Sequence, residues 1–219
     1  MKSYKFGNSV KGLPIWAHQF GSKGPKVLIL GGVHGDEHEG VAAAMGLLEN
    51  FHESFTYSLD ITVVPMLNVD GVLLKQRKNA NSVDLNRNLP TKDWTPEVQK
   101  EKYYPGKEPL SEPENQALHK WVEEEKPHYI YSLHSWKPVL IDNNALSKPE
   151  CEILSKLTGY RIEEDIGYPT PGSLGTYGSV ERAIPTLTYE LERGMDLKEI
   201  KDVHVPALLE ALKVTQNRF

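Results

Sequence analysis

The chain has 219 residues, 39% hydrophobic and 25% charged, which is typical of an ordinary globular protein with one substantial core. Its formal net charge of −5 argues against a nucleic-acid-binding protein, which would normally carry a basic face. The single cysteine, Cys151, excludes an intrachain disulfide and a thiolate zinc cluster.

Short apolar runs bounded by Gly, Pro or polar residues predict strands at residues 15–20, 26–30, 60–67, 129–134, 138–141 and 185–192. Apolar residues at helical spacing predict helices at 39–51, 150–157 and 202–216. A further helix should follow Ser111, which has the capping-box spacing with Glu114. This alternation predicts an α/β protein: a mixed, largely parallel twisted sheet with helices on both faces, in a single domain over residues 1–219.

A possible metal-binding motif lies where the strand at 26–30 passes into the first helix. His34 and Glu37 can both turn toward the carboxyl end of that strand, where α/β sheets place their ligands. His134, at the end of the strand at 129–134, offers a third ligand. A catalytic zinc typically takes three protein ligands and a water. We therefore expect one Zn²⁺ per chain on His34, Glu37 and His134, although an isolated His-x-x-Glu is more often a pair of polar loop residues.

Two neighbouring residues need separate interpretations. His38 and Glu39 begin a His-Glu-x-x-His pattern, but Ala42 stands where the second histidine would be needed, so that zinc motif is absent. Asp36 could orient a metal-bound imidazole or could simply form a turn. The sequence leaves these two roles for Asp36 open.

Cationic and acidic groups follow further along the chain. Arg87 presents a planar guanidinium that fits a carboxylate, and the adjacent Asn86 can add an amide donor. Arg77 lies among other charged residues, so a solvated charge run is the alternative interpretation. Glu190 and Glu192 fall on the same side of the last predicted strand, and one of them could be a general base.

These motifs, in this order from about residue 31 to 191, resemble those of the zinc metallocarboxypeptidase superfamily, the carboxypeptidase A-like enzymes. The resemblance implies the fold described above and a zinc ion on the three predicted ligands. It also implies that Arg77 polarises the scissile carbonyl and that Asn86 and Arg87 hold the terminal carboxylate of the substrate. Glu190, rather than Glu192, matches the catalytic glutamate.

The resemblance extends to a mobile tyrosine upstream of a Gly-Ser turn. Tyr168 precedes Gly172 and Ser173 at nearly the family spacing, so it is the expected substrate-binding tyrosine, with Tyr177 as the alternative. Leu174 falls at about the position that sets specificity in the pancreatic enzymes. A leucine there offers no charge to a polar substrate side chain.

Within the superfamily the chain is most similar to the bacterial murein peptide amidases, through Phe6-Gly7-Asn8-Ser9-Val10-Lys11-Gly12, Pro109-Leu110-Ser111-Glu112-Pro113-Glu114 and Thr170-Pro171-Gly172-Ser173. This similarity implies a role in peptidoglycan turnover, by hydrolysis of the γ-D-glutamyl–meso-diaminopimelate amide bond. The alternatives are an N-acyl amino acid deacylase of the aspartoacylase or succinylglutamate desuccinylase kind, another carboxypeptidase, or a non-catalytic binding module.

The expected partner is a small peptide substrate with a free carboxylate. No apolar run approaches the length of a membrane span, and the N-terminus lacks the apolar core of a signal peptide. We therefore expect a cytoplasmic protein that contacts neither membrane nor nucleic acid. The sequence does not determine the oligomeric state, and a homodimer is one option.

Overall fold

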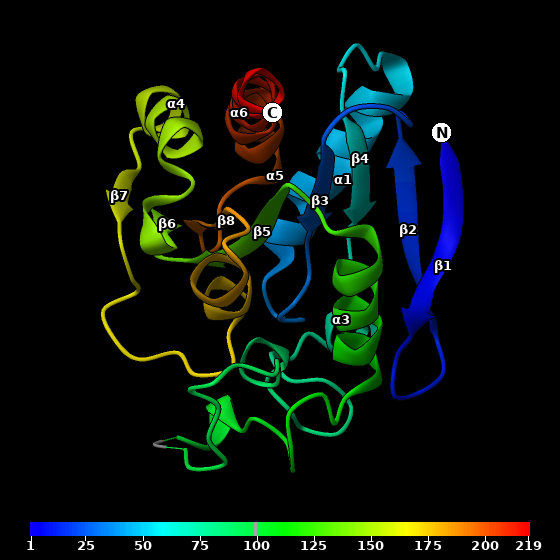
Figure 1. The fold of residues 1–219 in the computed structure, drawn as a ribbon, viewed down its shortest axis with the longest axis vertical. Helices are drawn as coiled ribbons and strands as arrows, with labels where there is room; N and C mark the ends of the chain where they lie inside the picture. The colour runs from blue at the N-terminus through cyan, green and yellow to red at the C-terminus, as the bar shows by residue number, and fades with distance from the viewer. Residues whose placement is uncertain (99) are drawn as a thin grey trace.

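A computed structural model describes residues 1–98 and 100–219 of the chain. These residues form an eight-stranded sheet in the order β1-β2-β4-β3-β5-β8-β6-β7 (Figure 1). The strands are β1 (Lys2–Asn8), β2 (Pro14–Phe20), β3 (Lys26–Leu30), β4 (Asp60–Val64), β5 (Tyr129–Trp136), β6 (Val139–Asp142), β7 (Arg161–Glu163) and β8 (Thr186–Glu192). The central strands β4, β3, β5 and β8 are parallel, whereas β2 and β6 join this group in antiparallel fashion. The mixed, largely parallel sheet expected from the sequence is confirmed.

Helices cover both faces of this sheet. The α-helices are α1 (His38–Glu53), α2 (Val69–Leu74), α3 (Pro113–Glu125), α4 (Lys148–Thr158), α5 (Leu197–Glu199) and α6 (Val205–Arg218). Short helical turns lie at η1 (Leu85–Arg87), η2 (Glu101–Tyr103), η3 (Asn143–Ala145), η4 (Thr176–Val180) and η5 (Ile200–His204). None of the helices in the described part of the chain is long and apolar enough to cross a membrane.

The strand β3 is apolar from Val27 to Leu30 because both of its faces are buried. In β3, Val27 and Ile29 pack into the core beneath α1, α4 and α6. Leu28 and Leu30 point to the other face, into a second core that includes residues of α3. Successive side chains of a strand alternate between faces, so a strand covered on both sides can be apolar at consecutive positions. This explains why β3 could be predicted.

Some predicted boundaries were wrong. The strand predicted at 60–67 ends at Val64, and the segment at 202–216 becomes regular α-helix only at Val205, after the wide turn η5. The edge strands β1 and β7 were missed, because β1 is largely exposed and β7 has only three residues. In β1 only Tyr4 and Phe6 alternate with polar residues, and β7 is too short to show an alternation.

The capping box predicted at Ser111 is also absent. The residue preceding α3 is Glu112, and no side chain caps that helix. The Ser111 hydroxyl donates to the Glu112 carboxylate, and Glu114 accepts from the Val10 and Asn79 nitrogens, each at 3.1 Å. Glu114 is fully buried, so tertiary hydrogen bonds replace the local cap.

The carboxyl ends of β3, β5 and β8 meet at one edge of the sheet, and the long connection from α2 to α3 gathers at that end (Figure 1). The capped turn of α2 brings this connection back toward the strand β3. Asn68 caps α2, and both its amide and the Gly35 N–H donate to the Arg77 carbonyl oxygen. A Cβ on Gly35 would lie 2.0 Å from the Gly71 carbonyl carbon, so this close approach requires glycine.

Candidate active site

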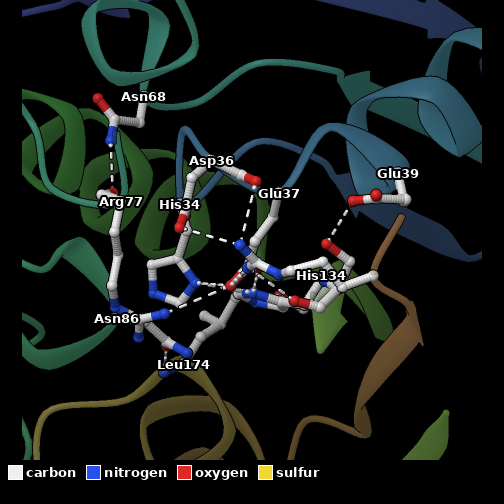
Figure 2. Close-up of polar contacts among 12 residues, drawn as sticks. His34, Asp36, Glu37, Glu39, Asn68, Arg77, Asn86, His134 and Leu174 are labelled. Atoms are coloured by element: carbon white, nitrogen blue, oxygen red, sulfur yellow. Dashed lines mark hydrogen bonds and ion pairs between the residues drawn. The ribbon is translucent and has the colours of Figure 1, made fainter. Parts of the chain in front are cut away.

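His34, Glu37 and His134 converge at the carboxyl edge of the sheet and are all nearly completely buried (Figure 2). His34 Nδ1 lies 2.8 Å from Glu37 Oε1, His134 Nδ1 lies 2.8 Å from Glu37 Oε2, and the two Nδ1 atoms are 3.2 Å apart. Ligand atoms around a tetrahedral zinc ion are separated by about 3.3 Å. The donor set, two imidazoles and one carboxylate, therefore fits a catalytic zinc centre in both chemistry and spacing.

The far nitrogen of each imidazole is held by a partner that turns Nδ1 inward. His34 Nε2 lies 3.0 Å from Asp84 Oδ1, and His134 Nε2 lies 2.9 Å from the Ser132 hydroxyl. Such outer partners fix the orientation of metal-binding histidines. The sequence did not single out Asp84 for this purpose. Its only local signal was its place at the start of the Asp-Leu-Asn-Arg stretch.

Asp36, for which an imidazole-orienting role was open, contacts neither histidine. Its carboxylate accepts from Arg193 at 3.0 Å, and its other oxygen is buried without a partner among the described residues. His38 is exposed and lies outside the group of converging ligands. The contact with an imidazole, which the sequence left open for Asp36, is therefore made by Asp84.

The electrostatics at the convergence point favour a cation. Burial opposes the charge on Glu37, but His34 and His134 bring the pKa of its carboxyl well below the usual range. Burial likewise opposes the charge on Asp84, yet His34 and Arg77 lower its pKa. Two ionised carboxylates therefore lie against the imidazole pair, in a site from which water is largely excluded.

Glu190 lies beside this centre because β8 pairs with β5 in parallel, with Glu190 opposite His134. Its side chain is buried, and no hydrogen-bond partner of its Oε2 occurs in residues 1–98 or 100–219. Burial raises the pKa of Glu190 to about 7. Glu192, two residues on, is exposed at the end of the strand. Glu190 is therefore buried beside the metal centre, whereas Glu192 is exposed to solvent.

Arg77 reaches the centre from the connection after α2. Its Nε and one terminal nitrogen donate to Asp84 Oδ2 at 3.0 and 2.9 Å, and the other terminal nitrogen lies 3.3 Å from Glu37 Oε1. The guanidinium also stacks on the Tyr103 ring, with its carbon 5.4 Å from the ring centre. Arg77 is therefore a fixed cation at the metal centre and not part of a solvated charge run.

Asn86 and Arg87 lie in the turn η1, which Asp84 caps by accepting the Asn86 N–H at 2.9 Å. The Asn86 side-chain oxygen accepts the Leu174 N–H at 2.8 Å, which leaves its amide nitrogen available (Figure 2). Arg87 is 5% exposed, and no acid in the described chain forms an ion pair with it. A buried guanidinium without a counter-ion is a strong candidate for binding an anion.

A cavity of about 1100 Å³ joins these groups, since the zinc-site residues His34 and Glu37, together with Glu190, Arg77, Asn86 and Arg87, all line it. Tyr168 lines the same cavity and is 38% exposed. Tyr177, the alternative, is fully buried in the core, and its hydroxyl lies 2.6 Å from His119 Nδ1. Of the two tyrosines, only Tyr168 has access to a substrate.

Leu174 does not lie where the family comparison placed it. Its side chain is buried in the core shared with α3, and it is absent from the cavity lining described above. The wall next to the Gly-Ser turn is formed instead by Ile141, Asn143, Gly175 and Thr188. The absence of charge at Leu174 therefore carries no information about the substrate.

The sequence also gave no signal for Arg193, which directly follows β8 and lines the cavity. One terminal nitrogen donates to the Asp36 carboxylate at 3.0 Å. The other donates to the Ser135 carbonyl oxygen at 3.0 Å and lies 3.3 Å from Glu37 Oε1. No motif distinguishes it from the charged residues around it, because its partners are remote in the sequence.

Comparison with known proteins identifies the family. Residues 1–196 match the zinc carboxypeptidase family model. The chain is 32% identical to murein peptide amidase A of Vibrio campbellii over 201 residues, covering 85% of this chain and 77% of that protein. It is 32% identical to murein peptide amidase A of Escherichia coli K12 over 184 residues, covering 78% of this chain and 74% of that protein.

Solved structures of other proteins also resemble this chain. The structure of murein-tripeptide amidase from Escherichia coli O157 superimposes with a TM-score of 0.80 at 27% identity, covering 97% of this chain and 92% of that one. Bovine thrombin-activatable fibrinolysis inhibitor, at 18% identity, shares the fold with a TM-score of 0.83, covering 100% of this chain and 91% of that one. The chain therefore belongs to the zinc carboxypeptidase family, and it is a hydrolase.

Proposed function

We propose that this protein is a zinc-dependent hydrolase that cleaves the γ-D-glutamyl–meso-diaminopimelate amide bond of murein peptides. One observation carries the hydrolytic part of the proposal. The buried Glu190 carboxylate, with an oxygen that has no described partner, lies beside three converging zinc ligands in a cavity that also contains the unpaired Arg87. The similarity to murein peptide amidases supports the choice of substrate.

One zinc ion per chain would be held by His34, Glu37 and His134. A bound zinc ion lowers the pKa of a coordinated water to about 7 and polarises a carbonyl group. Asp84 and Ser132 keep the two imidazoles oriented for this task, since each contacts the nitrogen opposite the ligand atom.

Glu190 acts as the general base and then as the general acid. It accepts a proton from the attacking water and later delivers it to the leaving amine as the amide bond breaks. Burial favours the neutral form of Glu190, which helps this group to hold the proton between the two steps. Arg77 donates to the carbonyl oxygen as negative charge develops there, which a fixed guanidinium can do without reorganisation.

Asn86 and Arg87 hold the free carboxylate of the leaving residue, so that only the bond next to a terminal residue reaches the metal. The guanidinium supplies a charge-assisted hydrogen bond and the amide a second donor. Tyr168 binds the substrate from the cavity lining, where its ring lies 6.0 Å from that of Tyr103. We also propose that residues 1–219 form one catalytic domain, because both cores are built on the same sheet.

Matched tripeptides test this function. The zinc-loaded enzyme should hydrolyse L-alanyl-γ-D-glutamyl-meso-diaminopimelate faster than the same peptide ending in lysine or leucine. Amidation of the terminal carboxylate should reduce turnover strongly, because Arg87 would lose its anion. A preference for the peptide ending in leucine would argue against a murein substrate. Equal turnover of the free and amidated peptides would contradict the binding of the terminal carboxylate by Asn86 and Arg87. Preferential hydrolysis of N-acetylaspartate would favour an N-acyl amino acid deacylase. We also propose that the protein acts in the cytoplasm.

A further inference from the structure

Arg193 is held in the active-site cavity by contacts that fix its guanidinium group. Its backbone N–H donates to the Trp136 carbonyl oxygen at 3.1 Å, which ties the end of β8 to the end of β5. One terminal nitrogen donates to the Asp36 carboxylate, and the other donates to the Ser135 carbonyl oxygen, each at 3.0 Å. Its side chain is nevertheless 41% exposed, and it lines the cavity. The Arg193 guanidinium is therefore held in place and is accessible from the cavity.

Arg193 also stands apart from the other positive charges of the cavity. The remaining lysines and arginines of the described lining all come from one segment of the chain: Arg77, Arg87, Lys100 and Lys102. Arg193 reaches the metal centre from the end of β8, and Arg77 reaches it from that segment, with both guanidinium groups 3.3 Å from Glu37 Oε1. In Figure 2, Asn86 and Asp36, to which Arg193 is bound, lie on different sides of His34. The centre therefore has cations from two directions.

The proposed substrate has anions in two directions as well. When glutamate is linked through its γ-carboxyl group, its α-carboxylate stays free on the acyl side of the scissile bond. The leaving residue carries its own carboxylate, for which Asn86 and Arg87 are already assigned. A peptide linked through α-carboxyl groups has no backbone carboxylate on the acyl side. A second cation on the acyl side of the metal centre would therefore favour recognition of a γ-linked glutamyl residue.

We propose that Arg193 binds this free α-carboxylate and thereby makes the enzyme selective for γ-linked glutamyl substrates. The inference rests on the proposed function and extends it to the acyl side of the substrate. Four hydrogen-bond contacts use the two terminal nitrogens, whereas Nε–H has no partner among residues 1–98 and 100–219. Asp36 and the Ser135 carbonyl oxygen hold the guanidinium plane while this edge stays available to the substrate.

A pair of substrates that differ in one group isolates this contact. The first is L-alanyl-γ-D-glutamyl-meso-diaminopimelate, and the second is the same peptide with the glutamyl α-carboxylate replaced by a carboxamide. A charge-assisted hydrogen bond predicts that the wild type prefers the carboxylate by about 10- to 100-fold in kcat/KM. In Arg193→Gln this ratio should fall to about one, and Arg193→Lys should retain part of it. Arg161→Gln, which removes an exposed arginine outside the described cavity lining, should keep the wild-type ratio.

The ratio is measured within each variant, so partial loss of zinc or of folded protein cancels. A direct binding measurement adds a readout that does not depend on turnover. By titration calorimetry, the wild type should bind the product L-alanyl-D-glutamate more tightly than its α-carboxamide, and Arg193→Gln should lose the difference. An unchanged ratio in Arg193→Gln would overturn the proposal and leave Arg193 as a structural partner of Asp36. If the wild type hydrolyses both peptides equally, Arg193 does not bind the glutamyl α-carboxylate, and the proposal is likewise wrong. If it hydrolyses neither, the proposed function itself fails.

Discussion

Two groups of buried charge lie on the same sheet and differ in how completely they are paired. In the active site, Glu190 has an oxygen without a described partner, and Arg87 forms no ion pair within the described residues. The second group, here called the core cluster, consists of Glu150, Arg218, Thr215 and Tyr131. Thr215 contacts one oxygen of Glu150 at 3.1 Å, Arg218 contacts the other, and the Tyr131 hydroxyl lies 2.7 Å from that of Thr215.

The comparison distinguishes buried charged groups that stabilise the fold from buried charged groups that take part in chemistry. A buried carboxylate with every oxygen occupied can hold helices together, as Glu150 joins α4 to α6. A buried carboxylate with an open oxygen lowers stability, and it is retained where that oxygen has a chemical task. Burial fractions alone would not distinguish them, because Glu150 and Glu190 are both nearly inaccessible.

The largest effect should follow from removing a metal ligand. His134→Ala should lose nearly all bound zinc and nearly all turnover, since two protein ligands remain where a catalytic zinc requires three. Elemental analysis of the purified protein would measure the first loss. Zinc should raise the melting temperature of the wild type but not of this variant. His38→Ala removes an exposed histidine next to the site and should retain zinc. Full zinc retention in His134→Ala would contradict the assignment.

The next effect concerns the unpartnered carboxylate. Glu190→Gln should lower kcat by about 10²–10⁴-fold, because an amide cannot accept the proton of the attacking water. Zinc content and melting temperature should stay close to those of the wild type. Glu192→Gln, two residues away and exposed, should be nearly neutral in the same assay. If the two variants exchange these behaviours, the proposed general base is wrong.

A smaller effect should follow from the outer partner of the imidazole. Asp84→Asn should weaken zinc affinity by about 10- to 100-fold, because the amide cannot supply the charge that orients and polarises His34. Competition with a chelator would measure this. Asp36→Asn is the matched control, since Asp36 adjoins the ligands in sequence but contacts neither imidazole. An equal loss of affinity in both variants would mean that general negative charge, and not the contact with His34, is responsible.

The core cluster should respond in stability and not in activity. Arg218→Met leaves Glu150 buried without its cation and should reduce the free energy of unfolding by about 2–4 kcal/mol. Turnover per folded molecule should not change. Lys213→Met, on the same helix but in an exposed ion pair, should have little effect.

This destabilisation should depend on pH. Burial raises the pKa of Glu150, and Arg218 opposes that rise. Without Arg218 the pKa of Glu150 rises further, so lowering the pH protonates the carboxyl group more readily, and the neutral group does not need a cation. The folded-state pKa lies above the unfolded one, which means that stability is lost as pH increases through it. Urea unfolding should therefore show a larger difference between variant and wild type at pH 8 than at pH 5.

The sequence by itself determined the parts of the site whose signals are local. His34, Glu37 and His134 follow or end apolar strands, and the carboxyl ends of parallel strands meet at one edge. The strand β3 was predictable because burial on both faces leaves an uninterrupted apolar run from Val27 to Leu30. The family motifs then assigned Glu190 in preference to Glu192, and the structure places Glu190 in the cavity and Glu192 in solvent.

Only the tertiary structure decided which polar groups meet across long distances in the chain. Asp84 contacts an imidazole 50 residues away, and Arg193 contacts a carboxylate 157 residues away. The same is true of Glu114, which accepts the backbone N–H of Val10 across 104 residues in place of the predicted local cap. Hydrogen bonds of this kind depend on the packing of several elements at once. Periodicity and spacing report the neighbours of a residue along one element, and they contain no information about partners that the fold brings from elsewhere.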